Sequence, residues 1–142
     1  MWKIDRALVE ITRYGNQYRA ERLEPEGLKC GHASYLTEIC REPGISQDTL
    51  AQRICISKSS VARQVAALEE DGFLTRTPAT EDKRVMQLYP TEKTLALFPQ
   101  VSRMLCTWED WLTGDLTQEE KTQLIGLLQR MKARARLWME AP

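Results

Sequence analysis

Apolar residues recur at helical spacing near the start of the chain. Between residues 3 and 22 they follow one another at steps of three and four, which predicts an amphipathic helix. Pro25 and Gly27 interrupt this pattern, and a second helix is expected over residues 28–41, before the sequence Glu-Pro-Gly at 42–44. The expected inward residues of the second helix are Tyr35, Leu36, Ile39 and Cys40.

Two shorter helices are predicted next. Ser46 and Ser57 stand where N-cap residues are expected, ahead of helices over residues 47–54 and 58–71. Gly72 follows the second of them, at a position where a left-handed residue commonly ends a helix. Two short helices joined by a tight turn form a helix-turn-helix.

Two β-like runs and two longer helices complete the pattern. Strands are expected at residues 73–77 and 84–89, joined by the turn-forming sequence Pro-Ala-Thr-Glu-Asp. A helix over residues 92–112, kinked or interrupted near Pro99, follows them. The last helix is expected from residue 118 to about residue 139 and is opened by the capping-box sequence Thr-Gln-Glu-Glu.

These elements predict a mainly α fold with a small antiparallel β-hairpin, arranged as a winged helix-turn-helix flanked by further helices. The length favours a single domain over residues 1–142, with the winged helix-turn-helix at 45–90. No apolar run approaches the length of a membrane span, and charged residues occur throughout the N-terminal segment, unlike a signal peptide. We therefore expect a soluble, cytoplasmic protein.

Charge does not by itself indicate a nucleic-acid partner. The chain has 20 basic and 20 acidic residues, and residues 45–90 are balanced as well. The argument for DNA binding must therefore depend on where charged side chains point. An enzyme is disfavoured, because the chain has one histidine, no nucleophile elbow, no glycine-rich phosphate loop and no metal-ligand spacing. No cofactor or metal is expected.

The outward face of the helix over residues 58–71 is the strongest candidate for chemistry. With Val61, Val65 and Leu68 facing the core, small residues and Arg63 lie on the outer side. The DNA major groove admits one helix, so a helix that contacts bases needs small residues and a few long donors. Arginine can bind guanine through two hydrogen bonds. The predicted recognition-helix contacts are Lys58, Ser59, Ser60, Arg63 and Gln64.

The hairpin carries a second basic group. Lys83 and Arg84 stand at its tip and could enter the minor groove, where narrow A/T-rich stretches attract arginine. Asp82 is placed to orient Arg84 through a bidentate pair, and Arg76 on the other strand could contact the DNA backbone. Each feature alone is common on protein surfaces, and their joint order along the chain is what favours DNA binding.

Residues 45–93 resemble the winged helix-turn-helix of the MarR family of bacterial transcription regulators. The segment ISQDTLAQRICISKSSVARQVAALEEDGFLTR is similar to the family's recognition segment, and EDKRVMQLYPTEK is similar to its wing signature. Asp82 and Arg84 occupy the Asp and Arg of that signature. The chain departs from the family's pattern at Cys55, where many helix-turn-helix proteins have glycine, and at Tyr89-Pro90.

The resemblance implies a homodimer that binds double-stranded DNA at a pseudo-palindromic operator, expected to act as a repressor. Dimerisation would use residues 1–24 and 91–142, and the expected interface residues are Ile4, Leu8, Ile11, Leu124, Leu128 and Met131. The family commonly responds to a small aromatic or phenolic effector. The candidate pocket residues are His32, Tyr35 and Arg13.

Two other functions remain open from the sequence. A winged helix can serve as a protein-interaction module, and the neutral charge of residues 45–90 is compatible with that role. A thiol-based redox-sensing regulator is the other alternative. Its candidate thiols are Cys30, Cys40, Cys55 and Cys106, although peroxide-sensing members of the family carry their reactive cysteine in the first helix, where this chain has none.

Overall fold

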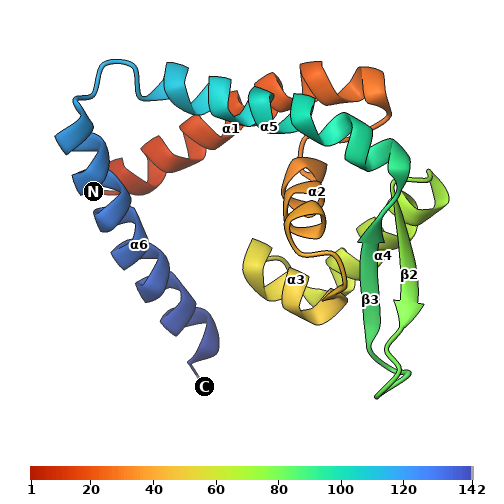
Figure 1. The fold of residues 1–142 in the computed structure, drawn as a ribbon. Helices are drawn as coiled ribbons and strands as arrows, with labels where there is room; N and C mark the ends of the chain where they lie inside the picture. Colours follow the sequence, from red (N-terminus) through yellow and green to blue (C-terminus); the bar gives the residue numbers. More distant parts are fainter. Residues whose placement is uncertain (142) are drawn as a thin grey trace. The chain divides into compact units, whose positions relative to one another are not determined.

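The computed structural model describes residues 1–141 and is mainly helical with one small antiparallel sheet (Figure 1). This confirms the predicted fold class. In chain order the elements are α1 (Lys3–Leu23), the 3₁₀ turn η1 (Glu24–Glu26), α2 (His32–Arg41), β1 (Ile45–Ser46), α3 (Gln47–Ile54), α4 (Lys58–Glu70), β2 (Leu74–Pro78), β3 (Met86–Pro90), α5 (Glu92–Leu112) and α6 (Gln118–Glu140). The chain forms two compact units, one over Met1–Cys106 and one from Thr107 onward.

Side-chain caps fix the starts of three helices, as the sequence predicts. The Ser46 hydroxyl accepts a hydrogen bond from the Thr49 backbone N–H at 3.1 Å. The Ser57 hydroxyl accepts one from the Ser60 backbone N–H at 3.2 Å. At the start of α6 the side chains of Thr117 and Glu120 cap each other's backbone N–H groups reciprocally. Each cap satisfies donors that have no partner inside the helix.

The second helix begins later than predicted. α2 starts at His32 and not at residue 28, because Gly27 adopts a left-handed φ of 81° and turns the chain after η1. The Leu28 backbone N–H instead donates to the Leu23 carbonyl at 3.1 Å, and the Leu28 side chain is buried. Residues 28–31 therefore form a connecting loop between η1 and α2.

The helix expected over residues 92–112 is not interrupted at Pro99. α5 runs through Pro99 as one helix from Glu92 to Leu112 (Figure 1). Buried residues on both sides of the proline, Thr94 before it and Val101 and Met104 after it, hold the helix against the protein. Packing therefore outweighs the one backbone hydrogen bond that a proline removes.

The sheet has one strand more than the sequence predicted. Its order is β1-β3-β2, and β1 pairs with β3 through Ile45 opposite Leu88. The strand expected at 84–89 begins at Met86, because the Val85 N–H donates to the Asp82 carbonyl and keeps that segment in the turn. The strand expected at 73–77 is β2, at Leu74–Pro78.

The core lies where the helix-turn-helix meets the sheet. Val61, Val65 and Leu68 of α4 are buried, as predicted, and so are Phe73 and the other large apolar residues around them. Of the residues expected to face inward from α2, Tyr35, Leu36 and Ile39 are buried, while Cys40 is half-buried. α4 is therefore fixed with one face inward and the opposite face in solvent.

The first and last helices expose apolar side chains. α1 buries only Gly15 and Leu23, and none of the described residues of α6 is buried. The side chains left in solvent include Ile4, Leu8, Ile11, Leu124, Ile125, Leu127, Met131 and Leu137. Among the described residues, no helix is both long enough and apolar enough to cross a membrane.

Candidate nucleic-acid interface

The solvent face of α4 presents a short row of donors. Lys58, Ser59 and Arg63 are exposed, while Ser60 and Gln64 are half-buried. Arg63 Nη2 donates to the Ser60 hydroxyl at 3.2 Å, one turn earlier in the helix. Because Val61 and Val65 face the core, Arg63 has to point outward. The row therefore combines small serine side chains with a long guanidinium, which is the composition that close approach to base edges requires.

The first turn of α4 suits a phosphate group. The helix dipole and the backbone N–H groups that the Ser57 cap does not bind favour an anion there. Lys58 Nζ lies 3.5 Å from Asp48 Oδ2, and both side chains are largely exposed. A pair this exposed stabilises the fold little, so Lys58 can exchange Asp48 for a phosphate at small cost.

The tip of the hairpin between β2 and β3 holds an oriented arginine. The Ala79 backbone N–H donates to the Val85 carbonyl at 2.8 Å and closes the loop. Arg84 donates from Nε to Asp82 Oδ1 at 3.1 Å and from Nη2 to Asp82 Oδ2 at 3.2 Å. The hydrogen bonds from Arg84 lower the pKa of the Asp82 carboxyl. The Arg84 side chain is 91% exposed, so a held guanidinium projects into solvent beside the exposed Lys83.

Two residues of the predicted DNA-contacting set make part-buried hydrogen bonds to residues outside that set. Arg76 donates from Nε and Nη2 to Glu69 Oε1 at 3.1 and 2.9 Å. Gln64 Oε1 lies 2.8 Å from His32 Nε2. Glu69 was missed by sequence reasoning, because the only signal for it was an opposite charge seven positions from Arg76, across a helix end and a glycine.

His32 connects α2 to α4 and is held in one neutral form. Its Nδ1 accepts a hydrogen bond from the Lys29 backbone N–H at 3.0 Å, so its one ring proton is on Nε2 and donates to Gln64. Burial lowers the pKa of His32 below its ordinary 6.5. The hydrogen bond to Gln64 and the charge of Asp71 oppose this shift, and the charge of Lys29 adds to it.

The buried neutral histidine predicts that stability falls in mild acid. A group that folding keeps neutral contributes its full stability above its unfolded pKa, and that contribution is lost as the pH falls through the folded value. The loss can reach about 1.4 kcal/mol per pH unit for one proton. Urea unfolding between pH 7 and 5 measures it. His32→Gln, which removes the chain's single histidine, should flatten the pH dependence relative to wild type. An identical pH dependence in the variant would contradict the assignment.

The larger of two cavities described here lies among α1, α2 and α5. It has a volume of about 420 Å³ and is lined by Asn16, Arg19, Cys30, Gly31, Ala33, Ser34, Thr37, Glu38 and Leu105. The predicted pocket residues His32, Tyr35 and Arg13 do not line it. His32 and Tyr35 are buried with their rings packed edge to face, and Arg13 is exposed on α1. His32 nevertheless stands between two lining residues in the sequence.

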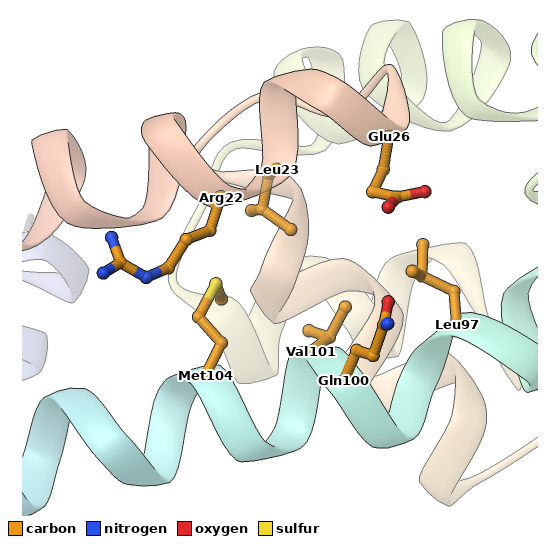
Figure 2. Close-up of a pocket in the computed structure, with 7 residues that line it drawn as sticks. All are labelled: Arg22, Leu23, Glu26, Leu97, Gln100, Val101 and Met104. Carbon is orange, nitrogen blue, oxygen red and sulfur yellow. The ribbon is translucent and has the colours of Figure 1, made fainter.

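A smaller cavity of about 220 Å³ lies beside the end of α1. Figure 2 shows its apolar side chains, with Leu23 on α1 facing Val101 and Met104 on α5, and Arg22 and Glu26 toward its two ends. Arg22 is already engaged, since its guanidinium lies 3.7 Å from the centroid of the Tyr18 ring.

The four cysteines are all free thiols. Cys55 is exposed in the turn between α3 and α4 and has a φ of 59°, a strained value for a residue other than glycine. Burial raises the pKa of the Cys40 thiol, which makes it less reactive. Among the described residues, no group of three or more His, Cys, Asp or Glu side chains is placed to hold a metal ion.

Known proteins are similar to this chain in sequence. The sequence model of the MarR family matches residues 31–86. The HTH-type transcriptional regulator BilQ of Clostridium symbiosum is 34% identical over 109 residues, which are 77% of this chain and 76% of that protein. The HTH-type transcriptional regulator YybA of Bacillus subtilis is 32% identical over 102 residues, which are 72% of this chain and 68% of that protein.

Solved structures are similar in fold over nearly the whole chain. The transcriptional regulator SlyA matches with a TM-score of 0.90 and 28% identity, covering 94% of each chain. A MarR family transcriptional regulator from Listeria monocytogenes, in complex with a 26mer DNA, matches with a TM-score of 0.89 and 25% identity. That match covers 94% of this chain and 89% of the other.

Proposed function

The chain belongs to the MarR family of transcription regulators, which are DNA-binding proteins and not enzymes, and we propose that it is a homodimeric repressor of a pseudo-palindromic operator. The observation that carries the proposal is the pair of exposed, held guanidinium groups, Arg63 on α4 and Arg84 on the wing. In the proposed complex α4 lies in the major groove and the wing tip in the minor groove. The structural neighbour from Listeria, which was solved in complex with a 26mer DNA, supports DNA binding.

The proposed dimer explains why the terminal helices expose apolar side chains. Two copies of α4 must lie about 34 Å apart to enter successive major grooves on one side of the DNA. α1 and α6 supply apolar surface that the chain itself leaves in solvent, including Ile4, Leu8, Ile11, Leu124 and Met131. Leu128, half-buried on α6, completes the proposed interface set. A two-fold axis would bury this surface and fix the spacing of the two copies.

The proposed effector is a small aromatic or phenolic anion that releases the DNA. The cavity of about 420 Å³ has a suitable size for such a molecule, and Arg19 and Asn16 supply polar groups on its wall. Gly31 and Ala33 of that wall flank His32, whose ring is hydrogen-bonded to Gln64 of α4. An effector that favours a different position of α2 would thus also disfavour the DNA-bound position of α4. The proposed place of action is the cytoplasm, where the operator would lie.

Selection from a random duplex library tests the proposal. The purified protein is incubated with the library, the bound fraction is sequenced, and the recovered duplex is titrated between 50 and 200 mM salt, a range over which about six phosphate contacts change affinity by roughly 10³-fold. We expect a recovered site with two-fold symmetry and half-sites about one DNA turn apart. Weak binding with no preferred sequence would reject the proposal of an operator-specific repressor. It would favour the alternative of a protein-interaction module.

A further inference from the structure

The last turn of α4 is bonded directly to the first strand of the wing. The carboxylate of Glu69 accepts three hydrogen bonds from one residue, Arg76. Oε1 accepts from Arg76 Nε at 3.1 Å and from Nη2 at 2.9 Å, and Oε2 accepts from the Arg76 backbone N–H at 3.1 Å. Both guanidinium donors bind the same carboxylate oxygen, and each of these bonds is charge-assisted and therefore stronger than a neutral hydrogen bond.

The position of β2 in the sheet explains the third bond. β2 is an edge strand in the order β1-β3-β2, so the backbone groups on its outer side have no strand to pair with. Arg76 lies opposite Leu88 of β3, and its N–H points away from the sheet to Glu69. The Glu69 side chain therefore occupies an edge site that water or another strand would otherwise fill.

The pair adds a polar attachment between α4 and the wing to those that the fold already provides. The first attachment is the chain itself, which turns at Gly72 with a φ of 82° while the Phe73 N–H donates to the Leu68 carbonyl at 2.8 Å. The second attachment is packing, since Leu74 of β2 and Leu88 of β3 are buried in the core and β3 pairs with β1. These contacts hold the base of the wing. The Glu69–Arg76 pair adds a directional bond two residues into β2, on the strand that leads to the loop carrying Arg84.

We propose that Glu69 and Arg76 are positioning residues for DNA binding, which set the direction of the wing relative to α4 so that Arg84 and Arg63 meet the DNA together. This inference rests on the proposed function. It gives Arg76 a role different from the direct phosphate contact expected from sequence. It also assigns a favourable role in DNA binding to an acidic residue, which a purely electrostatic account would treat as repulsive.

Removing the charge of Glu69 should weaken DNA binding if Glu69 positions the wing, and should leave it unchanged or strengthen it if Glu69 only repels the DNA. Glu69→Gln removes one negative charge from α4, and Glu70→Gln removes the same charge one position later, at an exposed residue whose side chain forms no hydrogen bond or ion pair within the described chain. We expect Glu69→Gln to weaken operator binding roughly fivefold, the effect of losing one partly exposed charge-assisted pair. Glu70→Gln should leave binding unchanged or tighten it, because it only lowers repulsion. Operator binding by Glu69→Gln as tight as by Glu70→Gln would overturn the proposal.

Arg76→Lys provides the second test. Lysine keeps the positive charge of arginine but lacks the guanidinium whose two nitrogens bind Glu69. The proposal expects weaker binding with an unchanged salt dependence, and no further loss when Glu69→Gln is added. A phosphate contact predicts instead that Arg76→Lys binds as well as wild type, while Arg76→Gln lowers the salt slope by about one. That result would overturn the proposal. Both positions are about one-third exposed, at 35% for Glu69 and 31% for Arg76, so the variants should fold.

A measurement without DNA keeps this inference separate from the proposed function. Amide ¹⁵N relaxation of residues 79–85 reports the mobility of the wing tip in the free protein. We expect Glu69→Gln and Arg76→Lys to increase that mobility and Glu70→Gln to leave it unchanged. Equal mobility in the wild type and the three variants would show that the Glu69–Arg76 pair does not restrain the wing tip. It would overturn the proposal even if the protein binds its operator. Increased mobility in a protein that binds no operator would reject only the proposed function.

Discussion

Replacing Arg63 by alanine is expected to remove most of the protein's preference for its operator over unrelated DNA. A bidentate arginine–guanine contact contributes about 1–3 kcal/mol of discrimination, which is roughly 10- to 100-fold in relative affinity. Arg63 is the one exposed arginine on α4, and its guanidinium is held by Ser60. Fluorescence anisotropy with an operator duplex and a shuffled duplex of equal composition measures the ratio directly.

Adding Arg84→Ala should bring operator binding close to the level of unrelated DNA. Arg84 lies on the wing and not on α4, so the two losses should be close to additive. The salt slope should also fall by about one for the lost wing contact in each subunit.

Arg63→Lys is the matched control for this experiment. Lysine keeps the positive charge but lacks the planar fork, so affinity for the shuffled duplex should stay near the wild-type value while the preference for the operator falls. If Arg63→Ala keeps the wild-type preference, α4 does not contact the bases through this residue. The assignment of α4 as the recognition helix would then be wrong.

Introducing charge on the terminal helices is expected to have the second large effect. Ile4 on α1 and Leu124 on α6 are 66% and 39% exposed in the single chain, so Ile4→Glu with Leu124→Glu should not disturb the subunit's own core. In the proposed dimer, both changes place a carboxylate in an apolar interface. We expect the mass in solution to fall from that of two chains to the 16.4 kDa of one.

Loss of the dimer should weaken operator binding by about 10²-fold or more, because the second half-site no longer benefits from the first. Sedimentation and anisotropy on the same samples measure both effects. Leu95→Glu is the matched control, since Leu95 is a leucine of α5 that is 52% exposed and is not among the six residues predicted for the interface. A double variant that keeps the mass of two chains would place the interface elsewhere.

Short-range rules explain what could be predicted from the sequence. Ser46, Ser57 and the Thr117 capping box fixed helix starts that the structure reproduces. The inward face of α4 followed from the spacing of Val61, Val65 and Leu68, and this spacing also placed Arg63 outward. Each of these features depends on residues within one or two helical turns, where geometry is nearly independent of the rest of the protein.

Tertiary packing decided the features that the sequence did not predict. β1 has only two residues and exists because β3 lies beside it, so it has no pattern of its own to recognise. α5 stays continuous through Pro99 because the core holds buried residues on both sides of it.

The roles of charged and polar side chains divide in the same way. The sequence determined that Ser59 and Arg63 share an outer face of α4, and it placed Asp82 two positions before Arg84 at the wing tip. Only the tertiary structure decided that Arg76 binds Glu69 and that Gln64 faces His32. Helix periodicity fixes the direction of a side chain, but its partner depends on which distant segment the folded chain brings within about 3 Å, the reach of a hydrogen bond.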